Sequence, residues 1–371
     1  MTTNLTADQA TRVFNFSAGP ATLPLSVLQQ IQDELLTLPD VGASVMEISH
    51  RSADFDRIIE DAETRIGQLL NLPETHEVLF LQGGAALQNV MIPANLLVNS
   101  DQTADYLITG SWGKKSAAEV HHYGRLNVAF DGSDTGFSRL AADSEQRFSE
   151  GGAYCHFTSN ETIQGVQYPE LPKTNAPLVV DKSSDMFSAP INVSDYGLIY
   201  ACAQKNVGIA GVTLVIIEKS LLERSGDRLP SYLSYAKHSK GGSRFNTPPT
   251  FAIYVTGLVC KWLQEEVGGL QAMADINQRK AAMLYQAIDS SDGFYQGHAA
   301  EDCRSVMNVV FKLGTDELDA KFLEEAAAES MKTLKGHRSL GGIRASIYNA
   351  MPIEGVEALA QFMQDFANKN G

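Results

Sequence analysis

Short apolar segments alternate along this chain with longer segments in which apolar residues recur every three or four positions. Runs of roughly four to eight apolar residues between turn residues are typical of buried strands, whereas the wider spacing is typical of amphipathic helices. Strands that alternate with helices indicate a doubly wound α/β sheet. The pattern predicts one large, seven-stranded, mostly parallel sheet, with strands at residues 78–81, 104–109, 126–130, 154–158, 178–181, 198–201 and 212–217.

The chain becomes strongly helical after the Pro248-Pro249 pair, and a second, smaller group of elements follows. Helices are predicted at residues 85–97, 116–123, 253–264 and 270–288. The second group combines strands and helices, at residues 305–313, 317–330, 343–348 and 355–368. We therefore expect a large domain at residues 20–270 and a smaller α+β C-terminal domain at residues 271–371, joined by the N-terminal segment 1–19.

The composition permits a sizeable core and disfavours large anionic partners. The chain has 371 residues, of which 44% are hydrophobic, an ordinary share for a globular protein. Its formal net charge is -15 and it contains no Lys/Arg-rich run, which argues against a nucleic-acid partner or an anionic membrane surface. Any small anionic ligand must therefore be held by a local group of cations.

The four cysteines indicate a reducing compartment. Cys155, Cys202, Cys260 and Cys303 are far apart, show no CxxC spacing and lie in apolar segments, so we expect reduced core residues and no metal site. The N-terminus has neither a basic region nor an apolar region of an export signal, and no run of roughly 18 apolar residues occurs. We expect a cytoplasmic protein without a membrane partner.

Two predicted strand ends carry a lysine and a carboxylate. Asp181 closes the apolar run 177–181, and Lys205 closes the stretch 198–205 before a glycine-containing loop. Desolvation disfavours the ammonium form of such a lysine, so its amine can act as a nucleophile and form a Schiff base. A carboxylate on a neighbouring strand can keep the ring nitrogen of a pyridine cofactor protonated. The pair indicates pyridoxal phosphate chemistry, although an ordinary loop lysine and a turn aspartate also fit these two residues.

Three further segments place suitable groups at strand ends, where ligands of open α/β sheets usually bind. Residues 83–86 run through two glycines into a helix, which fits either a phosphate cradle or a tight turn without a ligand. Trp112 can stack on a flat cofactor ring or pack in the core. A threonine of segment 158–162 can bond a phenolic oxygen of the cofactor.

Seven stretches, in order along the chain, together resemble the phosphoserine aminotransferases. They are Phe14-Asn-Phe-Ser-Ala-Gly-Pro20, Ile48-Ser-His-Arg51, Asn160-Glu-Thr162, Ala203-Gln-Lys-Asn206, Phe245-Asn-Thr-Pro-Pro-Thr250, Gly336-His-Arg338 and Gly342-Ile-Arg-Ala-Ser-Ile-Tyr-Asn-Ala350. The resemblance runs from about Phe14 to Met363. It implies a fold-type-I pyridoxal phosphate transferase, active as a homodimer with sites at the subunit interface.

The resemblance also implies a reaction. An amino group would pass between L-glutamate and 3-phosphohydroxypyruvate, giving O-phospho-L-serine and 2-oxoglutarate in serine biosynthesis, and the related 4-phosphohydroxythreonine step of vitamin B6 synthesis fits the same family. A nicotinamide-dependent oxidoreductase would need a glycine fingerprint with an acidic residue ~20 positions on, and the sequence has none. A catalytically silent interaction protein would not need Lys205, Asp181 and Arg344 together. Another fold-type-I aminotransferase or desulfurase, acting on a different small acid, is the closer alternative.

Carried over position by position, the resemblance implies roles for individual residues. Lys205 is the Schiff-base lysine, Asp181 the partner of the pyridine nitrogen, Trp112 the stacking ring and Thr162 the donor to the cofactor O3′. The cofactor phosphate is bound by Ala85, Ala86 and Gln204, joined by Asn246 and Thr247 of the partner subunit. Arg344 takes the substrate α-carboxylate, and the side-chain phosphate or carboxylate is bound by His50, Arg51, His337 and Arg338.

Two positions depart from commoner family forms. Ala86 stands where some relatives have arginine or serine, so only its backbone can serve the cofactor phosphate. Lys182 follows Asp181 where an apolar residue is more usual, which changes the local charge.

Overall fold

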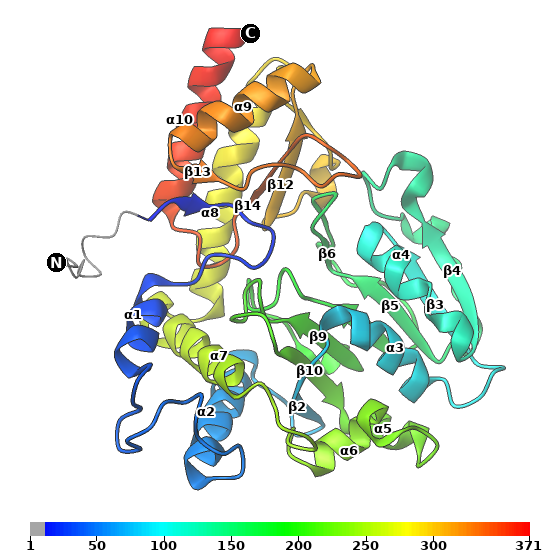
Figure 1. The fold of residues 1–371 in the computed structure, drawn as a ribbon. Helices are drawn as coiled ribbons and strands as arrows, with labels where there is room; N and C mark the ends of the chain where they lie inside the picture. Colours follow the sequence, from blue (N-terminus) through cyan, green and yellow to red (C-terminus); the bar gives the residue numbers. More distant parts are fainter. Residues whose placement is uncertain (1–11) are drawn as a thin grey trace.

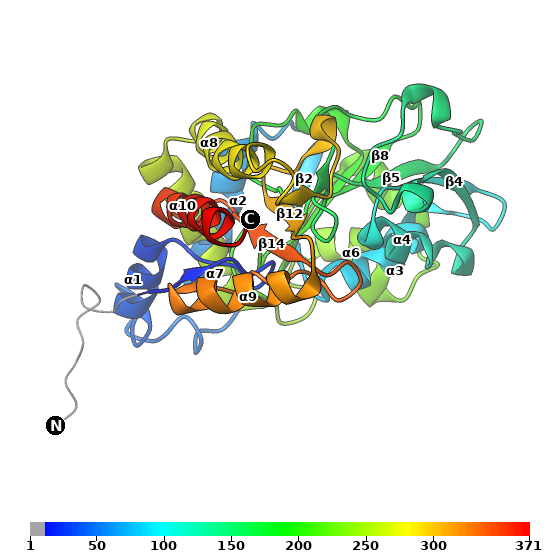
Figure 2. The ribbon, with the colours of Figure 1, turned by 90° about the horizontal axis from the view of Figure 1, so that it is seen from above.

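The computed structural model describes residues 12–371 and divides into a larger region around one sheet and a smaller region that contains the C-terminal helix (Figure 1). Of the expected N-terminal segment 1–19, residues 1–11 lie outside the described residues. Strand β1 (Phe14–Asn15) pairs in parallel with β13 (Met331–Lys332), so the first described strand is joined to the smaller region. Figure 2 shows both regions from above.

All seven predicted strands are present, each within two residues of its predicted ends, and they form one sheet. Strand β10 is antiparallel to both neighbours, whereas the other pairings are parallel. The prediction of a mostly parallel seven-stranded α/β sheet is therefore confirmed. Their order across the sheet is β2 (His76–Leu81), β10 (Thr213–Glu218), β9 (Leu198–Cys202), β8 (Leu178–Asp181), β5 (Tyr154–Thr158), β3 (Thr103–Ile108) and β4 (Arg125–Asp131).

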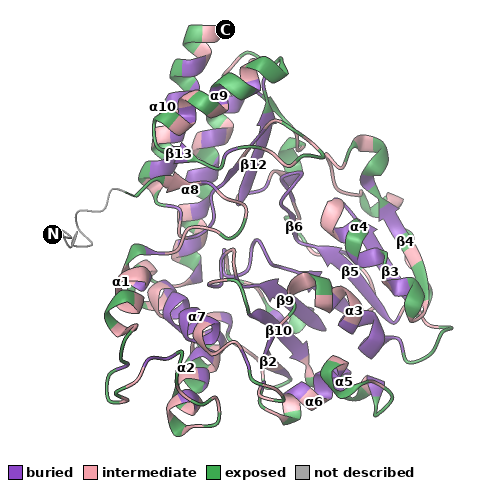
Figure 3. Ribbon diagram, in the orientation of Figure 1, coloured by how far each residue is buried: buried purple, intermediate pink, exposed green. Residues whose placement is uncertain are grey.

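Helices cover both faces of this sheet, which explains why strands such as β8 and β9 are almost entirely apolar. On β2, Leu79 and Leu81 belong to one hydrophobic core and Phe80, pointing the opposite way, belongs to another. Helix α3 (Gly84–Leu96) packs in the core of the first face. Helices α2 (Ala53–Leu70) and α7 (Thr250–Trp262) pack in the core of the second face, where most of α7 is buried (Figure 3).

The predicted helix 116–123 is wrong in position. Helix α4 spans Ser111–Ala117, and a short 3₁₀ turn (Val120–His122) follows it. The helix begins early because the Glu161 carboxylate accepts the backbone N–H groups of Trp112 and Gly113, which satisfies two donors at its first turn. Helix α1 (Leu25–Glu34) and α2, before the first strand of the sheet, add to the predicted helices.

The smaller region has its own core. Strands β11 (Gln296–Gly297), β12 (Asn308–Lys312) and β14 (Ile343–Ser346) form a sheet, covered by helices α8 (Leu270–Asp289), α9 (Asp316–Ala328) and α10 (Ile353–Asn370). The first turns of α8 pack in the core of the main sheet and its later turns in the second core. We propose that the two cores mark two domains, with the boundary inside α8.

The two predicted strands of this region are shorter than expected because polar contacts end them. The Ser305 hydroxyl accepts the N–H groups of Met307 and Asn308, which forms a turn before β12. After β14, the fully buried Lys280 Nζ donates to the carbonyls of Ile347 at 3.0 Å and Tyr348 at 2.8 Å. Burial lowers the pKa of Lys280 to about 7.

Three further observations concern the described residues alone. None of their helices is both long and apolar enough to cross a membrane. No group of three or more His, Cys, Asp or Glu side chains among residues 12–371 is arranged to hold a metal ion. The four cysteines are all free and buried.

Candidate active site

The carboxyl ends of four neighbouring strands meet at one edge of the sheet and carry the central predicted residues. Trp112 follows β3, Thr162 follows β5 and the short strand β6 (Asn160–Glu161), Asp181 ends β8, and Lys205 follows β9. The Lys205 Nζ lies 5.7 Å from the centre of the Trp112 ring. The structure therefore brings these four residues to one place, as expected for the ligand edge of an open α/β sheet.

Trp112 is held through both its ring and its backbone. The ring Nε1 donates to the Thr162 Oγ1 at 2.7 Å. The backbone N–H of Trp112 donates to Glu161 Oε2 at 3.0 Å, and that of Gly113 donates to Glu161 Oε1 at 2.8 Å. Sequence reasoning did not single out Glu161, whose only signal was its place beside Thr162.

Asp181 is a buried carboxylate with spare capacity for a hydrogen bond. Its Oδ1 accepts the backbone N–H of Ser183 at 2.8 Å. Within residues 12–371 no hydrogen bond is formed by the second oxygen. Burial raises the pKa of Asp181, and the charge of Lys205 and the bond from Ser183 act against that rise. A cationic donor facing the free oxygen would lower the pKa further and keep the group ionised.

Lys182, next to Asp181, carries a charge that is neutralised locally. Its Nζ forms a buried ion pair with Asp185 Oδ2 at 2.9 Å. Asp185 also accepts a bond from the Ser159 hydroxyl at 2.6 Å. The departure from an apolar residue at this position therefore leaves Asp181 beside an internally balanced pair.

The start of α3 is a backbone cradle beside the end of β9. Gly83 and Gly84 have positive φ values of 82° and 61°, and no side chain caps the helix. The Ala85 N–H donates to Cys202 Sγ at 3.1 Å, while Ala86 is exposed. First-turn N–H groups of a helix are a general site for phosphate groups.

The N-terminal segment closes over the turn that carries Gln204 and Lys205. The Ala21 N–H donates to the Gln204 carbonyl at 2.9 Å. Gly19 has a φ of 138°, and a Cβ there would lie 3.5 Å from Lys205 Cγ. A side chain at residue 19 would thus be strained by the backbone conformation, and its Cβ would be in van der Waals contact with the lysine stem.

Cations gather beside Trp112. Arg344, on β14, is half-buried, and burial lowers its pKa. Burial also lowers the pKa of His337, as do the charges of Arg344, Arg338 and Lys115, so these four side chains lie within electrostatic reach of one another. Lys115 Nζ lies over the Trp112 ring, 4.4 Å from its centre. Sequence reasoning missed Lys115.

Four predicted residues are not brought to Lys205 within this chain. His50 and Arg51 lie before α2, where the Arg51 N–H donates to the nearby Ser49 hydroxyl at 3.2 Å. Asn246 and Thr247 lie near the end of β2, where the Thr247 carbonyl accepts a bond from Gln82 Nε2 at 3.0 Å. In the described part of the chain no hydrogen bond or ion pair joins any of the four to Lys205, Asp181 or Arg344.

A polar network ties this edge of the sheet to the smaller region. Asn160 Nδ2 donates to Asn308 Oδ1 at 2.8 Å, and Asn308 Nδ2 donates to the Tyr348 hydroxyl at 3.2 Å. The Tyr348 hydroxyl in turn donates to the Ala18 carbonyl at 2.9 Å. These buried bonds fix β14, and with it Arg344, relative to the strand ends.

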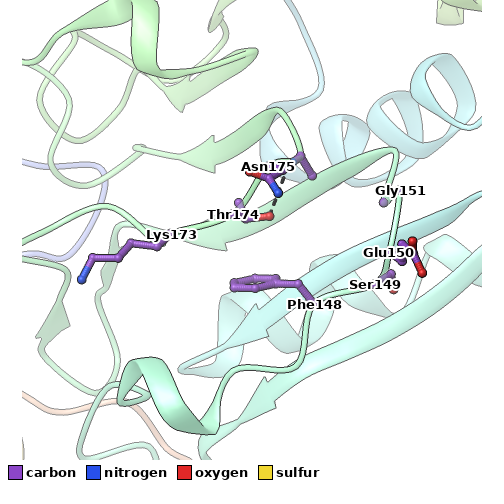
Figure 4. Close-up of a pocket in the computed structure, with 9 residues that line it drawn as sticks. Phe148, Ser149, Glu150, Gly151, Lys173, Thr174 and Asn175 are labelled. Carbon is purple, nitrogen blue, oxygen red and sulfur yellow. Dashed lines mark hydrogen bonds between the residues drawn. The ribbon is translucent and has the colours of Figure 1, made fainter.

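A cavity of about 480 Å³ lies elsewhere, at the amino ends of β5 and β8, and therefore at the opposite edge of the sheet (Figure 4). It is lined by residues 148–152 and 173–176, none of which is a predicted site residue. The candidate active site is thus defined by its side chains and not by this cavity.

The chain is similar to known proteins over almost its whole length. The model of the family "Aminotransferase class-V" matches residues 13–359. The chain belongs to the class-V aminotransferases. A relative from Rhodopirellula baltica, named phosphoserine aminotransferase, is 53% identical over 366 residues, covering 98% of this chain and 97% of the relative.

Solved structures agree with this membership. The phosphoserine aminotransferase from Bacillus circulans subsp. alkalophilus is 44% identical, with a TM-score of 0.95 over 98% of this chain and all of that one. The pyridoxal phosphate-bound phosphoserine aminotransferase from Trichomonas vaginalis is 39% identical, with a TM-score of 0.90 over 95% of this chain and all of that one. The resemblance read from the sequence is therefore confirmed.

Proposed function

We propose that this class-V aminotransferase uses pyridoxal 5′-phosphate to transfer an amino group from L-glutamate to 3-phosphohydroxypyruvate. The products are 2-oxoglutarate and O-phospho-L-serine, a step of serine biosynthesis. The observation that carries the proposal is the group of basic side chains Arg344, His337, Arg338 and Lys115 beside Lys205 and Trp112. The named relatives, about half identical over almost the whole chain, favour this reaction over one on a different small 2-oxo acid.

The residues present fit the cofactor. A flat indole lies beside a lysine amine, a buried carboxylate has a free oxygen, and an uncapped helix start offers N–H groups. Lys205 would hold the cofactor covalently, and Asp181 would bond its ring nitrogen. Trp112 would cover the face of its ring, and Thr162 would bond its O3′. Its phosphate would be held by Ala85, Ala86 and Gln204, with Asn246 and Thr247 of the partner subunit. When bound, pyridoxal phosphate supplies the electron sink for charge that develops at the substrate Cα.

The remaining steps belong to the protein. The half-buried Lys205 amine, once free, takes the proton from the substrate Cα as a general base. The Trp112 ring shields one face of the site from water. Arg344, with its planar fork, holds the α-carboxylate that both substrates share.

The other cations would hold whichever second anion the substrate carries. Glutamate offers a carboxylate where phosphoserine offers a phosphate, and arginine and histidine bind both. The net charge of -15 does not oppose this, because charges beyond roughly 8 Å are screened at physiological ionic strength. His337 and Arg338 are proposed for this role, with His50 and Arg51 of the partner subunit.

A coupled assay with the purified protein tests the reaction. We expect turnover of glutamate with 3-phosphohydroxypyruvate, and in the reverse direction a strong preference for phosphoserine over serine. Equal use of phosphoserine and serine would contradict the phosphate pocket.

Lys115 is expected to contribute to binding of the phosphorylated substrate. Because Lys115 is exposed, we expect Lys115→Gln to raise KM for 3-phosphohydroxypyruvate only modestly, roughly threefold to tenfold, as for a partly solvated charge-assisted contact. The effect on glutamate should be smaller because its carboxylate carries less charge than a phosphate. Lys114→Gln is the matched control: Lys114 is also exposed on α4, and steady-state kinetics should not change. An equal effect of both variants would point to general electrostatics.

We also propose a homodimer with shared sites. Within one chain, no hydrogen bond or ion pair joins Lys205 to the described residues His50, Arg51, Asn246 and Thr247. In the loop before α2, the apolar residues Leu36 and Met46 have 85% and 58% of their surface exposed. A two-fold dimer places the same surface on both subunits. We further propose a cytosolic location, which the four free cysteines support.

Subunit mixing tests the shared sites. A Lys205→Ala chain mixed with an Asn246→Ala/Thr247→Ala chain should regain activity, because one site of each mixed dimer contains only native residues. Random pairing of equal amounts predicts about a quarter of native activity. The control mixes Lys205→Ala with Asp181→Asn: both residues lie in one chain's site, so no activity should return. Activity from this control pair, or none from the first pair, would contradict the arrangement.

A further inference from the structure

Glu161 is a buried carboxylate to which the proposed reaction assigns no role. Its side chain is fully buried, and its two oxygens accept the N–H groups of Trp112 and Gly113. A Cβ at Gly110 would lie 2.3 Å from Glu161 Cδ, so the chain before α4 packs directly against the carboxylate. The first turn of α4 is therefore anchored by a group from another element.

The residues that follow Glu161 hold the same turn at two more points. Thr162 Oγ1 accepts the bond from the Trp112 ring, and Gln164 Nε2 donates to the Ser111 hydroxyl at 2.9 Å. Backbone and ring of Trp112 are thus both fixed by segment 161–164. A weaker bond at Glu161 would alter how the ring lies over Lys205.

The charges around Glu161 make its ionisation sensitive near neutral pH. Burial raises the pKa of Glu161 to about 7, and the N–H bonds from Gly113 and Trp112 oppose this rise. The charge of Asp181 raises the pKa further, whereas the charge of Lys205 lowers it. Tyr168 also faces this region, and burial raises its pKa, so it stays neutral. On the α4 side, Lys115 lies over the Trp112 ring.

We propose that Glu161 is a positioning residue whose charge controls how firmly the Trp112 ring is held beside Lys205. The ionised form accepts two charge-assisted bonds at the start of α4, whereas protonation weakens both. The inference deepens the proposed function, because it rests on Trp112 as part of the cofactor site.

Indole fluorescence of the apoprotein tests this directly, since the chain has only two tryptophans, Trp112 and Trp262. In a Trp262→Phe background, the emission of Trp112 should change in a single step between about pH 5.5 and 8.5, with its midpoint within about one unit of 7. Adding Glu161→Gln should remove that step. A step that persists in the Glu161→Gln variant, or none in its parent, would overturn the proposal.

Matched variants identify the group that titrates. Burial also raises the pKa of Glu63, on α2, to about 7, so Glu63→Gln should leave the step unchanged. His337 is retained in every variant and cannot account for a step that is lost with Glu161. If Glu161→Gln does not fold, Glu161→Asp replaces it: the shorter carboxylate should shift the midpoint, and an unchanged midpoint would refute the inference.

The result of the fluorescence titration does not depend on whether the protein catalyses the proposed transamination. The titrated protein contains neither cofactor nor substrate, so a missing fluorescence step refutes the role of Glu161 alone. A normal step in a protein that fails the coupled assay refutes the reaction alone.

Discussion

Lys205→Ala is expected to abolish transamination while leaving the fold intact. The substitution removes both the amine proposed to hold the cofactor and the general base for the substrate Cα. We expect a loss of at least about 10⁴-fold in kcat, the upper end of what general acid–base catalysis supplies. The Lys205 side chain is half-buried and lies 5.7 Å from the Trp112 ring centre, so its loss should scarcely change circular dichroism or the melting temperature.

Chemical labelling identifies the lysine independently of rate. Borohydride reduction of the holoenzyme should fix the cofactor to the peptide that contains Lys205, as read by mass spectrometry. Lys114→Ala, an exposed lysine near the same edge, should keep native activity and native labelling. Label on a different lysine, or near-normal turnover by Lys205→Ala, would refute the role.

The main sheet could be predicted from the sequence because its strands are covered on both faces. A strand such as Leu178–Asp181 is entirely buried, and burial on both faces requires the uninterrupted apolar run that marks it in the sequence. The same physics predicts where this strand stops, since Asp181 is the first polar residue of that run. The prediction of this strand end therefore also pointed to Asp181 as a candidate site residue.

The start of α4 could not be predicted because a distant residue sets it. Glu161 lies 48 positions from Gly113, to which it is bound. In the local sequence Gly-Ser-Trp-Gly the helix N-cap is Gly110 and no side chain caps it, and two glycines disfavour a helix there. The contact that overrides this preference exists only once β3 and β5 are paired.

Some residues of the candidate site could likewise be predicted from the sequence, and others could not. Lys205 and Asp181 follow from residue type and place at strand ends. Arg344, His337 and Arg338 lie in the smaller region, and only the packing of that region against the main sheet brings them near Trp112, so the family resemblance was needed to select them. Lys115 carries no sequence signal, and the only signal at Glu161 is its place beside Thr162, because an exposed helical lysine and a glutamate in a two-residue strand are ordinary until their neighbours are known.

Asp181→Asn is expected to produce the second largest loss of activity. Asp181 is buried, accepts a bond from the Ser183 N–H at 2.8 Å, and has a second oxygen available for the cofactor ring nitrogen. Burial raises its pKa in the absence of a ligand. A protonated ring nitrogen is the cation that would reverse this rise and keep the carboxylate charged.

An asparagine at this position keeps the size of the side chain and removes its charge. The ring nitrogen would then lose its proton and the cofactor would become a weaker electron sink. Breaking one side of a buried charge pair costs about 3 to 5 kcal/mol, which corresponds to a fall of roughly 10²- to 5 × 10³-fold in the rate of proton removal. Exchange of the substrate Cα hydrogen with deuterium in the glutamate half-reaction measures that step alone. Asp181→Glu retains the charge with a longer reach and should recover part of the rate. If the asparagine variant exchanges the Cα hydrogen at the native rate, then Asp181 does not act on the cofactor nitrogen.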